Sequence, residues 1–283
     1  MTVKVTFDTN VFNLLVDPYK IKRDNPIYYF KIVEAIENNV IKGFFSDTFI
    51  TLEGVMKFSR SDVFGSRKID TVMYPGTTPN SISISIGASM QKTKINDVHK
   101  KKVTNILNLG LRALRGNLYL GDNFLPTLDC DIYDSIAIDE WIKISERMQR
   151  IEIAIAKKNK ESSKDVGKCR ARNLGLKLLG PKNKSKKVWY EGLSLCEDKK
   201  EVNSAVAEWA DGESVIRHFG YTNDYFCTLD EGKGGNKASI LDKEHKEWLS
   251  CEFGLKFVKP KELVEIIYQG LDKIDLTAFI CLK

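Results

Sequence analysis

Residues 2–12 read TVKVTFDTNVF, an alternation of polar and apolar residues that ends at an aspartate. Val3, Val5 and Phe7 fall on one side of an extended chain, because successive side chains of a strand point to opposite faces of a sheet. The stretch therefore predicts a short strand that ends at Phe7. It also predicts a carboxylate, that of Asp8, directly beyond the carboxyl end of this strand.

Short apolar runs alternate with helical repeats toward both ends of the chain. Further strands are expected at residues 43–45, 225–227 and 255–258, and helices at residues 26–40, 46–56, 202–219 and 260–267. Asp211-Gly212 is expected to interrupt the repeat of residues 202–219. The alternation predicts an α/β fold, in which helices cover both faces of a parallel sheet.

The middle of the chain is mostly helical in pattern. Serine alternates with isoleucine at residues 81–86, which predicts a strand. Apolar residues at helical spacing predict helices at residues 103–114 and 135–156. Gly175, Gly180 and Pro181 are expected to break any long helix in the basic segment that follows.

Positive charge is concentrated in one segment of this chain of net charge +6. Residues 157–187 contain 12 Lys or Arg and only two acids, so the rest of the chain is net acidic. A basic block of this kind suits a polyanion, because Lys and Arg that neutralise phosphates release counterions. A solvated loop without a partner is the alternative interpretation.

The composition, 42% hydrophobic and 29% charged, is typical of a soluble globular protein. No run approaches the roughly 20 apolar residues that span a bilayer, so no membrane partner is expected. The first residues also lack the regions of a signal peptide. The six cysteines include no CxxC pair, which argues against a disulfide framework or a zinc site. These features predict a cytoplasmic protein.

Acidic residues are expected to gather at one edge of the sheet, because the functional crevice of an open parallel sheet lies beyond the carboxyl ends of its strands. Asp8 and Asp230 directly follow predicted strands, and Glu53 and Asp211 lie near the starts of helices. An acid after a strand is more often a cap or turn residue. Converging carboxylates, however, need a cation to offset their repulsion, and oxygen ligands favour Mg²⁺ or Mn²⁺. Such ions support hydrolysis of a phosphodiester.

The motifs around these acids resemble those of the PIN-domain family of metal-dependent ribonucleases. Residues 7–12 (FDTNVF) look like the family's opening motif, and residues 46–53 are similar to its second, which carries a glutamate. Residues 210–230 resemble the part of the family's site in which an aspartate opens a helix and a strand ends in Thr-x-Asp. Residues 254–263 look like the closing strand, proline and helix.

This resemblance covers roughly residues 1–58 and 200–270, and it implies a three-layer α/β/α sandwich with a central parallel sheet. Residues 1–58 and 200–283 would form the PIN-like nuclease domain. Because 157 residues separate Glu53 from Asp211, residues 59–199 are expected to form a mostly helical insertion that carries the basic segment.

Carried over residue by residue, the resemblance implies that the catalytic residues and the ligands of Mg²⁺ or Mn²⁺ are Asp8, Glu53, Asp211 and Asp230. Asn10 and Thr228 would orient these carboxylates through hydrogen bonds.

Asp211 departs from the family pattern, because Gly212 and Glu213 follow it where small apolar residues are usual. The possible substitutes for it are Glu208, Glu213 and Asp224, together with Asp134 and Asp139 from the insertion. Asp224 is better explained as a cap of the turn before its strand.

The resemblance implies an endoribonuclease that cuts single-stranded RNA and leaves a 5′-phosphate and a 3′-hydroxyl. Four lysines of the basic segment, Lys182, Lys184, Lys186 and Lys187, are expected to bind the RNA backbone. Two other functions stay open, a structure-specific DNA nuclease and an inactive RNA-binding scaffold. The oligomeric state and the presence of an inhibitory antitoxin-like partner stay open as well.

Other residues with reactive or stacking side chains are expected to be structural. His99, His218 and His245 are too scattered for a triad or a metal cluster. Trp189 and Tyr190 either stack on unpaired bases or anchor a hydrophobic core, and the core is favoured.

Overall fold

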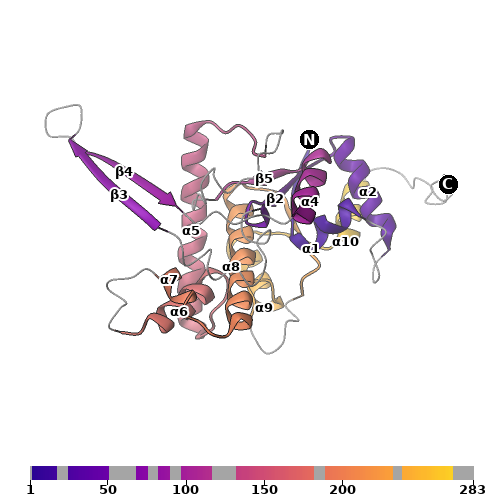
Figure 1. Cartoon of the computed structure of the whole chain (residues 1–283). Helices are drawn as coiled ribbons and strands as arrows, with labels where there is room; N and C mark the ends of the chain where they lie inside the picture. The colour runs from indigo at the N-terminus through magenta and orange to yellow at the C-terminus, as the bar shows by residue number, and fades with distance from the viewer. Residues whose placement is uncertain are drawn as a thin grey trace.

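A five-stranded parallel sheet lies at the centre of the computed structural model (Figure 1). Its strands are β1 (Val3–Phe7), β2 (Ile41–Ser46), β5 (Arg112–Leu114), β6 (Tyr225–Cys227) and β7 (Phe257–Val258), in the spatial order β5-β2-β1-β6-β7. The structure describes residues 2–17, 25–50, 68–75, 82–89, 97–116, 132–181, 189–231 and 238–269. The parallel sheet predicted from the sequence is confirmed.

The register of the sheet puts the residues that follow β1, β2 and β6 at the same edge. Thr6 of β1 pairs with Phe44 of β2 on one side and with Phe226 of β6 on the other. Because all these pairings are parallel, the carboxyl ends of the strands lie together. Asp8 is therefore beside Ser46 on one side and Thr228 on the other.

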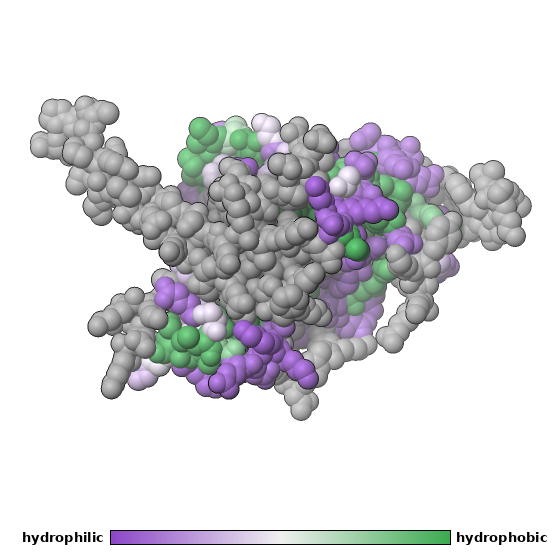
Figure 2. All heavy atoms as spheres, in the orientation of Figure 1, coloured by the Kyte–Doolittle hydropathy of each residue, from purple (hydrophilic) through white to green (hydrophobic). Residues whose placement is uncertain are grey.

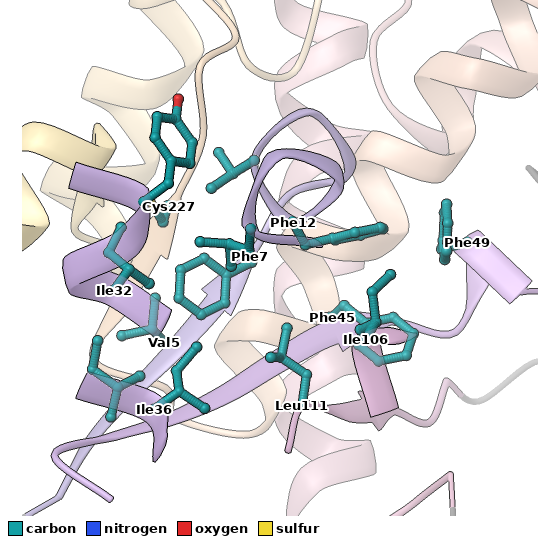
Figure 3. Packing of buried hydrophobic residues seen from close by; sticks show 14 of the residues in the cluster. Val5, Phe7, Phe12, Ile32, Ile36, Phe45, Phe49, Ile106, Leu111 and Cys227 are labelled. Atoms are coloured by element: carbon teal, nitrogen blue, oxygen red, sulfur yellow. The ribbon is translucent and has the colours of Figure 1, made fainter. Parts of the chain in front are cut away.

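One face of the sheet is covered by α1 (Thr9–Val16), α2 (Pro26–Glu37), α4 (Asp97–Asn108) and α10 (Pro260–Tyr268). Figure 3 shows the core between these helices and the strands, with Phe7 and Phe12 at its centre. The ring of Phe12 meets that of Phe49 edge-on, at 4.4 Å between centroids, an arrangement that aromatic pairs favour. This core buries the apolar side of the predicted first strand.

The opposite face is covered by α5 (Ile138–Ser162), α8 (Lys199–Gly220) and α9 (Lys243–Phe253). Phe226 packs into this second core, whereas its neighbour Cys227 packs into the first. Successive residues of a strand point to opposite faces, so a strand buried on both sides is apolar throughout. Helices thus cover both faces of the sheet.

Two shorter helices, α6 (Lys168–Leu179) and α7 (Trp189–Leu193), pack against each other and against the first half of α8. Trp209 and Tyr190 are buried in this third core. A side chain at Gly175 would place its Cβ 2.0 Å from the backbone oxygen of Trp189. The glycine therefore permits the close approach of α6 and α7. As predicted, α6 ends at Gly180, which adopts a positive φ of 67°. Gly175 lies inside α6, so the helix break that was also expected there is wrong.

An antiparallel hairpin, β3 (Lys68–Pro75) and β4 (Ile82–Ser89), extends away from the helices in Figure 1. β4 contains most of the predicted strand at residues 81–86. The hairpin is separate from the central sheet.

Two further expectations from the sequence differ from the structure. α8 runs without interruption through Asp211-Gly212, so the predicted break there is wrong. A Cβ on Gly212 would lie 2.8 Å from the Cα of Gly167, which shows that this glycine serves helix-to-loop packing.

The second difference lies in the middle of the chain, where residues 103–114 were expected to form a single helix. The helix α4 ends at Asn108, and residues 112–114 form β5, the edge strand beside β2. Part of the expected insertion, which starts at residue 59 in the sequence-based division, therefore belongs to the central sheet.

Polar and apolar residues are mixed on the face shown in Figure 2. Apolar surface is visible at the start of α5, where Ile138 is 81% exposed and Ile142 is 52% exposed. In the described part of the chain, no helix has the length and apolar character needed to cross a membrane.

Candidate functional site

Asp8 ends β1 and caps α1, and its carboxylate is fixed by hydrogen bonds to both oxygens. The backbone N–H of Thr9 donates to Oδ1 at 2.7 Å. Oδ2 accepts from the amide of Asn10 at 2.8 Å and from the hydroxyl of Thr228 at 2.7 Å. The two residues expected to orient this carboxylate therefore contact it directly.

Asp230 is brought to the same edge by the loop that follows β6. The hydroxyl of Thr228 donates to Asp8 and accepts from the backbone N–H of Asp230 at 2.9 Å. The side-chain oxygen of Asn10 accepts from the backbone N–H of Leu229 at 3.0 Å. Asn10 and Thr228 thus join the ends of two strands that are 218 residues apart along the chain.

Asp8 is nearly buried, with 6% of its surface exposed. Burial raises the pKa of Asp8, and the negative charge of Asp230 raises it further, against the opposing effect of the hydrogen bonds from Thr228, Thr9 and Asn10. The charge of Asp230 therefore disfavours the ionised form of Asp8, and a cation placed between the two carboxylates would relieve the repulsion.

The donor atoms at this edge suit a hard cation such as Mg²⁺ or Mn²⁺. Oδ1 of Asp8 accepts one hydrogen bond and so retains a lone pair for a ligand bond. Among the residues that the structure describes, no three His, Cys, Asp or Glu side chains are arranged to hold a metal ion. Of the four acids expected to bind the cation, Asp8 and Asp230 lie close enough for the charge of one to act on the other.

Asp211 lies in the middle of α8 and is half-buried, so the expectation that it stands near the start of a helix is wrong. It precedes His218 by seven residues, two helical turns, so both residues lie on nearly the same face of the helix. His218 bonds to Thr6 of β1, and Arg217 bonds to Ser46 at the carboxyl end of β2. Asp211 therefore lies beyond the carboxyl edge of the sheet, about 10 Å along the helix from His218.

Glu53 and the four lysines Lys182, Lys184, Lys186 and Lys187 lie outside the described residues.

The alternative acids have structural partners or lie elsewhere. Glu208 accepts from the backbone N–H groups of Gly167 and Ile240. Asp224 accepts from the backbone N–H of Lys4 at the amino end of the neighbouring strand β1, and is therefore at the opposite edge from Asp8.

The two alternative acids from the expected insertion, Asp134 and Asp139, have structural roles as well. Asp134 pairs with Lys42 at 2.8 Å. Asp139 lies in the first turn of α5, where an acid favours the helix dipole.

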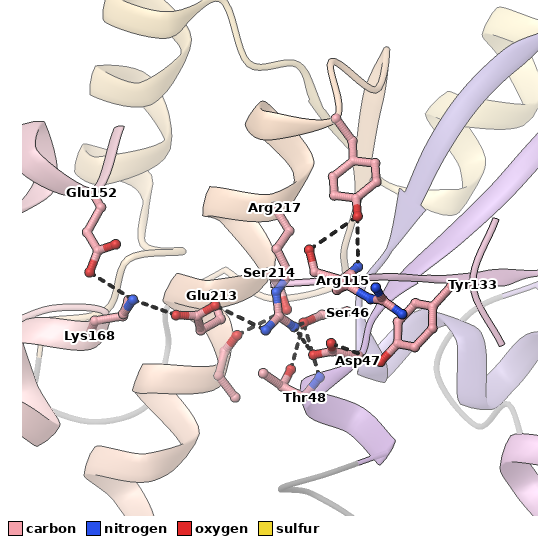
Figure 4. Close-up of polar contacts among 12 residues, drawn as sticks. Ser46, Asp47, Thr48, Arg115, Tyr133, Glu152, Lys168, Glu213, Ser214 and Arg217 are labelled. Atoms are coloured by element: carbon pink, nitrogen blue, oxygen red, sulfur yellow. Dashed lines mark hydrogen bonds and ion pairs between the residues drawn. The ribbon is translucent and has the colours of Figure 1, made fainter. Parts of the chain in front are cut away.

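A buried ionic network, which the sequence analysis missed, occupies the other half of the same edge (Figure 4). The guanidinium of Arg217, 1% exposed, pairs with Asp47 directly after β2 and with Glu213 at 3.2 Å. Lys168 of α6 bonds to Glu213 at 2.6 Å and to Glu152 of α5 at 2.8 Å. The network links the helices of the expected insertion to the sheet.

Arg217 is held as a cation in this network. Burial alone would lower the pKa of Arg217, but the charges of Asp47 and Glu213 raise it. Gly116 leaves the space for it, because a Cβ there would lie 2.1 Å from Nη2 of Arg217. An arginine within the apolar run 215–219 was the signal in the sequence for a buried charge that needs partners.

Each of the three histidines bonds to another group of the protein. His218 is buried and bonds to Thr6 at 2.9 Å, which agrees with the expected structural role. His99 bonds to the backbone oxygen of Phe49 and His245 to Asp242.

Trp189 and Tyr190, the two aromatic residues after the basic segment, differ in how deeply they are buried. Tyr190 is buried in the third core, as the sequence favoured, whereas Trp189 is partly exposed.

No family model, no curated protein and no solved structure matches this chain.

Proposed function

We propose that this chain is a metal-dependent endoribonuclease with a PIN-like site at the edge where Asp8 and Asp230 lie. The observation that carries the proposal is the pairing of these two acids after neighbouring parallel strands, with Thr228 bonded to both residues. Carboxylates presented in this way are suited to binding cations that act on a phosphodiester. The order of motifs along the chain supports the PIN-like assignment.

The proposed ligands of Mg²⁺ or Mn²⁺ are Asp8, Asp230, Asp211 and Glu53. The cation, when bound, supplies positive charge and a coordinated water of lowered pKa. Asn10 and Thr228 keep Asp8 in one orientation through the hydrogen bonds described above, and groups in this position are needed for tight metal binding.

Single-stranded RNA is the proposed substrate, cut by in-line attack of water in the cytoplasm. The basic segment supplies long-range attraction for its phosphates. The part of this segment that the structure describes, residues 157–181, comprises the end of α5, α6 and the residues that adjoin α6. α6 packs on the first half of α8. The proposed role of the segment is to hold substrate and not to take part in the reaction.

The test compares Asp8→Asn and Asp230→Asn with a matched control, Asp224→Asn. Asp224 lies at the amino end of β6 and Asp230 beyond its carboxyl end, so the control makes the same chemical change at the opposite edge of the sheet. Labelled single-stranded RNA and a DNA of the same sequence are incubated with each protein, with Mn²⁺ or with excess chelator. We expect cleavage of RNA by the wild type and Asp224→Asn, and background cleavage by the other two.

Cleavage that persists in excess chelator would overturn the metal-dependent mechanism. Preference for the DNA would favour the structure-specific DNA nuclease, and binding of RNA without cleavage would favour the inactive scaffold. Equal activity of Asp8→Asn and Asp224→Asn would remove Asp8 from the site.

A further inference from the structure

A pocket of about 620 Å³ adjoins the candidate site on the side of β6 and β7. Thr228, which bonds to Asp8, forms part of its wall, and the rest comes from α9, β7 and the start of α10. A volume of this size is within the range of small-ligand sites, roughly 300–1,000 Å³. The pocket is therefore continuous with the residues that hold Asp8 and Asp230.

The charged residues of this pocket are three lysines and two glutamates: Lys243, Lys246, Lys259, Glu247 and Glu262. The ammonium group of Lys246 donates to the backbone oxygen of Asp230 at 2.7 Å. Within the described part of the chain, Lys246 forms no ion pair with a carboxylate. Its positive charge is thus held beside the candidate site without a neutralising partner.

The other two lysines of the pocket, Lys259 and Lys243, form ion pairs that differ in distance and exposure. Lys259 pairs with Glu231 at 2.6 Å, so its charge is largely compensated. Lys243 is 3.8 Å from Glu247, and both side chains are well exposed. A pair of this kind contributes little energy in water, so Lys243 is available to an incoming anion.

The apolar part of the pocket contains an aromatic ring, that of Phe257, which is partly exposed. The ring packs against Phe226 with 5.6 Å between centroids, and this contact fixes its position. An accessible, fixed aromatic ring is a surface on which a nucleobase can stack. A cation and an aromatic ring in one pocket match the phosphate and the base of a nucleotide.

We propose that this pocket binds one nucleotide of a single-stranded RNA next to the phosphodiester that is cut. Its phosphate contacts Lys246 and Lys243, and its base stacks on Phe257. The inference rests on the proposed function and adds to it the residues that position the RNA at Asp8 and Asp230. Contacts to phosphate and stacking on one ring carry little sequence information, so this nucleotide is bound whatever its base.

The experiment measures binding of a short fluorescent oligouridylate by anisotropy at several salt concentrations, with Asp8→Asn in every protein to keep the RNA intact. Lys246→Gln and Lys243→Gln are introduced separately. Glutamine at position 246 retains a donor for the oxygen of Asp230 while removing the charge. The matched control is Lys143→Gln, an exposed lysine of α5 that is 3.9 Å from Glu140 and outside the pocket.

We expect each pocket variant to weaken binding and to reduce the slope of log K against log salt by about 0.7. Phe257→Leu should weaken binding by about fivefold or more with an unchanged slope, because it removes stacking but no charge. Lys143→Gln should leave affinity and slope unchanged. Thermal unfolding of each variant shows whether it is folded.

The outcomes separate this inference from the nuclease proposal. If the wild type cleaves RNA and the slopes of the two lysine variants equal that of the control, the pocket assignment is overturned and the nuclease proposal stands. If the wild type does not cleave RNA but the slopes fall as expected, the nuclease proposal fails and the pocket remains a nucleic-acid site. Absence of RNA binding by folded Asp8→Asn protein would overturn both.

Discussion

At the scale of single residues, the carboxyl edge of the sheet combines two kinds of charge. Among the residues that the structure describes, Asp8 has hydrogen-bond donors around it but no cationic side chain among its contacts, whereas Asp47, directly after the adjacent strand, is paired with Arg217. An acid that is already neutralised by a buried arginine serves the fold. An acid that only neutral groups contact has no side-chain cation to balance its charge, and a bound metal ion would supply one. This contrast separates Asp8 from Asp47, although each directly follows a strand of the sheet.

His218 makes the stability of the protein depend on pH. Its imidazole is buried, and burial lowers the pKa of His218 to about 3, from 6.5 in an exposed histidine. Between these values the unfolded chain binds a proton at this position and the native state does not. The free energy of unfolding contributed by His218 is therefore intact above about pH 6.5 and declines as the pH falls toward 3.

The variant His218→Gln, which retains a hydrogen-bonding group near Thr6, tests this dependence. Between about pH 6 and pH 5, the wild type should lose about 1 kcal/mol more unfolding free energy than the variant. Urea titrations at both pH values provide the measurement. Equal losses in the two proteins would show that the histidine is protonated in the native state.

At the scale of elements, α8 connects the pair α6 and α7 to the central sheet. Its first half packs against α6 and α7, and its second half packs against the sheet through Arg217 and His218. The helix crosses the loop at Gly167 with Gly212 at the contact, where backbone atoms meet. The local rule that glycine ends a helix is overridden here by tertiary packing, because no larger residue fits.

Exchanging glycine and alanine at two positions of α8 separates packing from helix propensity. Propensity alone predicts that Gly212→Ala stabilises the protein by about 1 kcal/mol and that Ala207→Gly, at an exposed position, destabilises it equally. Because the new Cβ would lie 2.8 Å from the Cα of Gly167, we expect Gly212→Ala instead to cost about 1–3 kcal/mol. Thermal and urea unfolding of both variants measure this, and a stabilised Gly212→Ala would contradict the packing.

At the scale of the whole molecule, a cation that binds at the site should stabilise the folded protein independently of any substrate. The unfolded chain does not hold Asp8 near Asp230, so binding to the native state alone raises its stability. At a free Mn²⁺ concentration of about 100 times Kd, the gain is about 2.7 kcal/mol, which corresponds to a rise of several degrees in Tm.

Thermal unfolding with Mn²⁺ and with chelator tests this in the wild type, Asp8→Asn and the control Asp224→Asn. We expect the rise in Tm in the wild type and the control, and its loss in Asp8→Asn. An equal rise in all three proteins would place the bound ion at another site.

The sequence by itself determined the α/β class and the acids that follow β1 and β6, because strand alternation and the residues after a strand are local properties of the chain. Only the tertiary structure decided that β1 and β6 are neighbours, that residues 112–114 join the sheet, and that Arg217 meets Asp47. Each of these depends on which distant surfaces pack together. Lys246 shows the same limit, because a lysine on a polar helix has no local signal for a bond to the oxygen of Asp230. Local patterns determine elements, and the burial of apolar faces from distant segments determines which side chains meet.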